Sequence, residues 1–122
     1  MAKTTKAHFK IFQKECKKWI KVFGLYGWDW RFFHEETKPN NLARSNYHPT
    51  AKWANITLNT DWGDFKITLH ELKKTAFHEV LESGLLGNLR CLAEDRRFNQ
   101  EEFDGEIHQI IERLSKVIMG GG

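Results

Sequence analysis

The stretch "AKWANITLN", residues 51–59, decides the fold class of this 122-residue chain. Trp53, Ile56, Thr57 and Leu58 are aromatic, β-branched or apolar, and such residues favour a half-buried strand over a helix. The following "TDWGD" is rich in the residues that form turns. We therefore expect a strand over residues 51–59.

Two further segments upstream have strand character. In "WDWRFFHEE", residues 28–36, the aromatic residues Trp28, Trp30 and Phe32 alternate with Asp29 and Arg31. This alternation predicts a strand with one buried face. After the turn "TKPNN", the segment "LARSNYH", residues 42–48, suggests a short additional strand. The sequence thus predicts a sheet of two or three strands.

Three segments on either side of these strands have helical periodicity. Residues 3–23 repeat apolar side chains at steps of three and four, and Gly24 ends the pattern. A second helix is expected from about residue 68 to 89. A third helix is predicted over residues 99–118, because Asn99 and Glu102 have the spacing of a capping box at its start. Its predicted inward residues are Phe103, Ile107, Ile110, Ile111, Leu114 and Val117. The order of helix, strands, helix, helix predicts a small α+β domain.

Length and composition predict one domain over residues 1–118, followed by a flexible tail at 119–122. No apolar run approaches the roughly 20 residues of a membrane span, and the N-terminus has no apolar signal core. The two cysteines, Cys16 and Cys91, lack C-x-x-C spacing. We interpret them as reduced thiols and expect a cytoplasmic protein.

The charge is unevenly distributed. Residues 1–66 contain twelve basic and six acidic side chains, whereas residues 67–122 contain seven and ten. The basic residues of the first helix are Lys6, Lys10, Lys14, Lys17, Lys18 and Lys21. Such a stripe is either a solvated helix face or an electrostatic footprint for nucleic acid. We favour the solvated face and expect no residue to bind nucleic acid.

The candidate chemistry lies in "HEVLE", residues 78–82 of the second helix. His78 and Glu82 are four residues apart and therefore lie on the same helix face. Glu79 lies beside this pair. The pattern differs from the helical zinc motif H-E-x-x-H only in its last residue. Zinc accepts histidine nitrogen and carboxylate oxygen, so His78 and Glu82 supply two candidate ligands.

The third helix offers a third ligand, because Glu106 and His108 lie on opposite margins of its apolar stripe. Helical geometry does not choose between them. The common H-E-x-x-H…E site contains two histidines and one carboxylate. With Glu82 in place of the second histidine, His108 restores that ligand set, whereas Glu106 would give an oxygen-rich site that suits zinc less well. We therefore predict His78, Glu82 and His108 as ligands, with Glu106 as the substitute.

Four segments resemble the small metallopeptidase-like proteins of bacteriophages and prophages, which are similar to reduced gluzincins. They are "GL..WDW" at residues 24–30, "ANITLN" at 54–59, "HEVLE" at 78–82 and "EIHQIIERL" at 106–114. The resemblance depends on the order of these four segments along the chain, and it covers residues 9–115. If the protein is encoded by a phage, its location would be the cytoplasm of the host.

The resemblance implies a zinc-dependent peptidase with His78 as first ligand and Glu79 as general base. Glu82 occupies the position of the second histidine, and His108 or Glu106 that of the third ligand. A peptide or protein substrate would add a strand to the free edge of residues 51–59.

Two alternatives stay open. One is a non-catalytic module, with structural metal or none, that binds a host protein or nucleic acid. The other is a phage structural protein whose H-E-x-x-E is accidental. The sequence does not place His34 relative to the site.

Overall fold

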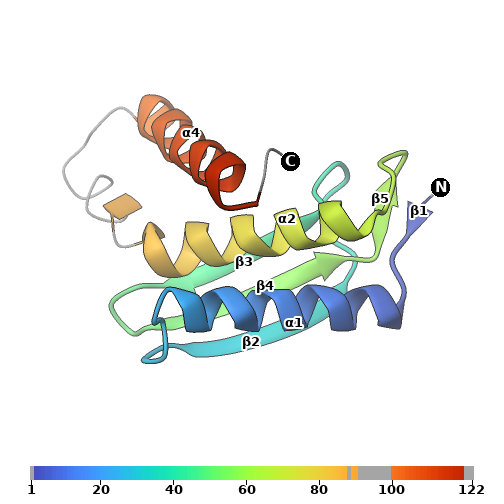
Figure 1. The fold of residues 1–122 in the computed structure, drawn as a ribbon, viewed down its shortest axis with the longest axis horizontal. Helices are drawn as coiled ribbons and strands as arrows, with labels where there is room; N and C mark the ends of the chain where they lie inside the picture. Colours follow the sequence, from blue (N-terminus) through green and yellow to red (C-terminus); the bar gives the residue numbers. More distant parts are fainter. Residues whose placement is uncertain (1, 88, 91–99, 120–122) are drawn as a thin grey trace.

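The computed structural model of the chain describes residues 2–87, 89–90 and 100–119. Their elements form an α+β fold, which confirms the predicted fold class (Figure 1). In chain order these elements are β1 (Ala2–Lys3), α1 (Lys6–Val22), β2 (Asp29–Glu35), β3 (Ala43–His48), β4 (Trp53–Asn59), β5 (Asp61–Gly63), α2 (Leu69–Val80), the π-helix η1 (Leu81–Leu85) and α4 (Gln100–Met119).

The main sheet has the strand order β2-β4-β3, with β2 parallel and β3 antiparallel to the central strand β4. Ala54, Ile56 and Leu58 of β4 are fully buried, as expected for the middle of a sheet. Both edges of β4 are paired, so the prediction that residues 51–59 offer a free edge to a substrate is wrong. The strand order explains the error, because it places β2 and β3, not β4, at the edges.

Helices α1 and α2 lie side by side over one face of this sheet, and α4 lies beyond α2 (Figure 1). Thr5 begins α1 with a reciprocal capping box to His8, and the hydroxyl of Thr68 accepts from the backbone N–H of Glu71 at the start of α2. As predicted, α1 stops at Gly24, whose φ of 68° lies in the left-handed region that suits glycine.

One hydrophobic core joins the sheet to the helices. Its buried members include Phe12, Cys16 and Trp19 of α1, Ile56 and Leu58 of β4, Leu72, Ala76, Phe77 and Val80 of α2, and Ile107 and Ile111 of α4. The thiol of Cys16 is free, and Cys91 lies outside the described residues. The prediction that Val117 points inward is wrong, because this side chain is 83% exposed on the outer face of α4.

The second predicted helix does not continue unchanged to residue 89. After Val80 the backbone widens into the π-helix η1, which contains Glu82. A side chain at Gly84 would meet Leu25 at 2.7 Å and Trp30 at 2.8 Å, so glycine allows η1 to approach the start of β2 closely. Short π-helical segments within helices are frequent at functional sites.

The ends of the chain differ slightly from expectation. Asn99, the predicted cap of the last helix, lies outside the described residues, and α4 includes Met119, one residue beyond the predicted domain end. Strand β5, which pairs with β1, falls in a stretch that we predict as a turn. Among the described residues, no helix has the length and apolar character needed to cross a membrane.

Candidate metal centre

His78 and Glu82 are in direct contact at the junction of α2 and η1. Nε2 of His78 lies 3.0 Å from Oε2 of Glu82, and the two side chains are only 28% and 17% exposed. Burial opposes protonation of His78, but the hydrogen bond to Glu82 and the charges of nearby carboxylates raise the pKa of the imidazole above its ordinary value. The pair therefore lies on one helix face, as predicted, in a half-buried setting where its interaction is little screened by solvent.

His108 reaches the pair from a second helix. The buried side chains of Ile107 and Ile111 pack α4 against the core and bring His108 over α2. The His78 and His108 ring centroids lie 5.6 Å apart. Ligand atoms of His78, Glu82 and His108 all lie within 4.8 Å of one another. Among the residues that the structure describes, these three are thus the group brought together as a possible metal site.

The donors of this group fit a metal ion of the zinc type. Two imidazole nitrogens and one carboxylate oxygen match the ligand types of a catalytic zinc site. The Nδ1 atom of His108 lies 2.7 Å from the carbonyl oxygen of Asp104. Donation of the Nδ1 proton to that carbonyl leaves Nε2 free as a ligand, which is the usual outer-shell arrangement of a metal-binding histidine. Zinc ligands about 2.1 Å from the ion stand roughly 3.4 Å apart, so binding would draw the exposed His108 inward.

Glu106, the substitute ligand, is exposed on α4 and does not belong to this group. Nor does His34, whose Nε2 lies 2.7 Å from the hydroxyl of Thr4 and whose ring stacks on Phe9. Burial lowers the pKa of His34, and the charge of His8 adds to this effect. His34 therefore belongs to the packing between the N-terminus and β2.

Glu79 lies next to the three candidate ligands but is more deeply buried. Its side chain is 8% exposed, and Oε2 lies 3.9 Å from Nε2 of His78. Burial raises the pKa of Glu79 to about 7, although the charge of His78 and a hydrogen bond from Ser45 act in the opposite direction. A carboxyl group that titrates near neutral pH is suited to accept a proton from a reacting water.

Glu82 has a second partner that the sequence did not indicate. Nη1 of Arg90 lies 2.9 Å from Oε1 of Glu82 and 3.2 Å from the hydroxyl of Tyr47 on β3. Burial alone would raise the pKa of Glu82, but the hydrogen bonds and charges of His78 and Arg90 lower it to about 2. Glu82 is therefore a carboxylate at neutral pH. Arg90 lies eight residues after Glu82, more than two turns along a regular helix, and Tyr47 lies on a strand, so helical periodicity does not predict contact among the three.

A cavity of about 330 Å³ opens beside His78 and Glu79. Its walls include Leu42, which precedes β3, Ala43 at the start of β3, and Lys74 and Thr75 of α2. The candidate ligand and the candidate base thus meet a space between the edge strand and the helix. A cleft with a few convergent polar groups is the usual form of a small-molecule or peptide site.

Comparisons of the chain with protein-family models, curated proteins and solved structures gave no match. The geometry of the site is therefore the basis for assigning a function.

Proposed function

We propose that the protein is a zinc-binding, metallopeptidase-like protein that holds one zinc ion with His78, Glu82 and His108. The observation that carries this proposal is the meeting of these three side chains, from two helices, beside the buried carboxyl group of Glu79. A zinc ion bound there would supply Lewis acidity for a peptide carbonyl and for a water.

Glu79 would act as the general base of the reaction. Glu79 adjoins His78 and lies within one helical turn of Glu82, and the pKa of about 7 allows its carboxyl group to accept a proton near neutral pH and to return it afterwards. Ser45 approaches the carboxyl group from the side of β3 and acts to lower its pKa. The base is thereby held between the helix that carries the ligands and the strand at the edge of the sheet.

The edge strand β3 supports a peptide as the substrate. The carbonyl groups of Leu42 and His48 accept hydrogen bonds from the region of β4, so alternation directs the backbone groups of Ala43, Ser45 and Tyr47 to the outer edge. An extended peptide can add a strand along such an edge. We thus place the substrate beside β3 and the adjoining cavity, not beside residues 51–59.

The proposal is tested first by metal content. Protein purified without chelator should contain about one zinc per chain, and His78→Ala and Glu82→Ala should each lose most of it. His70→Ala, which changes an exposed histidine on the same helix, is the matched control and should retain the metal. Wild-type metal content in both ligand variants would show that the site is assigned wrongly.

Hydrolysis is tested separately with casein and a mixed peptide library. Wild-type protein should cleave them and Glu79→Gln should not, because glutamine keeps the shape of the side chain but accepts no proton. Zinc content should be equal in the two proteins. Cleavage by Glu79→Gln would remove Glu79 from the mechanism, and bound zinc without cleavage by either protein would support the non-catalytic module.

A further inference from the structure

We infer that Arg90 is a positioning residue of the metal centre, which holds Glu82 in its ligand orientation and connects the two helices that carry the ligands. This inference rests on the proposed metal site. Arg90 follows η1 in the chain, and its side chain is 15% exposed, so its charge is largely withdrawn from solvent. A half-buried cation of this kind requires partners, and the structure provides three.

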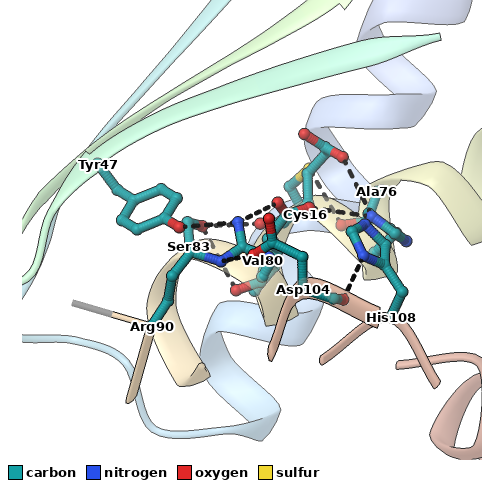
Figure 2. A network of polar contacts seen from close by, with 11 residues as sticks. Cys16, Tyr47, Ala76, Val80, Ser83, Arg90, Asp104 and His108 are labelled. Atoms are coloured by element: carbon teal, nitrogen blue, oxygen red, sulfur yellow. Dashed lines mark hydrogen bonds and ion pairs between the residues drawn. The ribbon is translucent and has the colours of Figure 1, made fainter. Parts of the chain in front are cut away.

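The three partners come from three different parts of the fold. Nη1 of Arg90 donates to Oε1 of Glu82 in η1 and to the hydroxyl of Tyr47 on β3. Nε lies 3.3 Å from Oδ1 of Asp104 on α4, in an ion pair without hydrogen-bond alignment. Figure 2 shows the guanidinium between Tyr47 on one side and Asp104 on the other. One side chain therefore joins the edge strand, the ligand turn and the last helix.

The contact with Arg90 determines the orientation of the Glu82 carboxylate. Its Oε2 faces His78 and its Oε1 faces Arg90, so its two oxygens are assigned to different neighbours. Rotation of the carboxylate would break the bond to Arg90. Arg90 thus keeps Oε2 of Glu82 directed toward His78 and His108, between which a metal ion would bind.

The contact with Asp104 extends this influence to the third ligand. The side chain of Asp104 pairs with Arg90, and its backbone carbonyl accepts the Nδ1 proton of His108. Arg90 thus contacts Glu82 directly and is linked to His108 through one residue, Asp104. Outer-shell partners that fix the orientation of ligands typically contribute about 10- to 100-fold in metal affinity.

Arginine suits this role better than lysine does. Nη1 contacts Glu82 and Tyr47 while Nε faces Asp104, and a planar guanidinium can direct both nitrogens at once, whereas an ammonium group is a single point of charge. Arg90 also offsets the negative charge of Glu82 and Asp104, which would otherwise repel each other across the ligand turn. Lysine at this position would keep the charge but lose part of the directional contacts.

The inference is tested by titration of the chelator-treated protein with zinc and with cobalt, whose visible absorption reports the ligand geometry. Arg90→Met should weaken metal binding about 10- to 100-fold and change the cobalt spectrum. Arg90→Lys should restore part of the affinity. Arg113→Met, which removes an exposed arginine on α4, is the matched control and should behave like wild type.

If Arg90 has a purely structural role, Arg90→Met should lower the melting temperature of the metal-free protein but leave the metal affinity and cobalt spectrum of the folded fraction unchanged. That result would overturn the inference. If Arg90→Met does not fold, wild-type affinity and spectrum in Arg90→Lys would overturn it equally. Absence of metal binding in the wild-type protein would instead refute the proposed function and this inference with it, so the two failures are distinguishable.

Discussion

Ser45 on the edge strand β3 lies beside the carboxyl group of Glu79 on α2 and acts to lower the pKa of that group. The two residues are 34 positions apart in the chain, and the contact joins the sheet directly to the candidate general base. A peptide that pairs with β3 would therefore lie against the strand that also orients this base. In the proposed reaction, substrate binding and proton transfer would then depend on the same strand.

Glu79→Gln should stabilise the metal-free protein at alkaline pH. The pKa of Glu79 in the fold, about 7, exceeds its ordinary value of 4.5, so folding favours the protonated form. The stability that this carboxyl group contributes is thus fully present below about pH 4.5 and is lost as pH rises through 7. We expect a gain of about 1–3 kcal/mol at pH 8.5 and little change at pH 4.5.

Thermal or urea unfolding in the presence of chelator measures this difference. Glu35→Gln, which alters an exposed carboxylate on β2, should show no comparable dependence on pH. An equal effect of Glu79→Gln at both pH values would contradict a buried Glu79 whose pKa is raised to about 7.

His108→Ala should weaken zinc binding far more than Glu106→Ala does. His108 belongs to the group of converging donors, whereas Glu106 is exposed outside it. Loss of a direct ligand should exceed the roughly 100-fold upper range of outer-shell changes. Direct titration of the chelator-treated variants with zinc gives the comparison, and the reverse order would transfer the role of third ligand to Glu106.

Gly84→Ala should destabilise the protein by about 1–3 kcal/mol, the usual range for overpacking. The new Cβ would lie 2.7 Å from Cδ1 of Leu25 and 2.8 Å from Cη2 of Trp30. The indole N–H of Trp30 is bonded to the carbonyl of Leu25, so the ring cannot retreat freely. Gly105→Ala is the control, because its Cβ meets nothing within 4 Å and alanine favours a helix. Unfolding free energies that rank the two variants in the other order would refute this account of η1.

The lysine face of α1 should not bind nucleic acid tightly. Its six lysines are exposed on one side of the helix, as a solvated face requires. We expect fluorescence anisotropy with single- and double-stranded oligonucleotides to show no binding tighter than about micromolar at physiological salt. Tighter, salt-sensitive binding that is lost on reversal of Lys14 and Lys17 to glutamate would favour the binding-module alternative.

The sequence predicted the elements well because each leaves a local pattern. Alternation marked β2, aromatic and β-branched composition marked β4, and the helical period marked α1 and α2. His78 and Glu82 were predicted together because they lie one turn apart, and His108 was preferred to Glu106 because it restores the usual zinc ligand set; the structure brings these three together.

What the sequence did not predict depends on contacts between distant residues. The order β2-β4-β3 leaves no local trace, so residues 51–59 were wrongly expected at an edge. The close approach of Gly84 in η1 to Leu25 and Trp30 joins residues that are far apart in the chain. Arg90 acquires its role only when β3 and α4 are folded around it.

The contacts of Glu82 have a consequence for how the protein would acquire an ion. Its two oxygens are satisfied by His78 and Arg90, so protein groups alone hold the ligand turn in shape. Small domains that fold around zinc lack such internal support and are unfolded before metallation. Here folding should come first and loading second. Metal uptake would then be an exchange, in which the cation displaces the proton between His78 and Glu82. The metal ion that the folded protein carries would depend on which cation its surroundings supply when it is loaded.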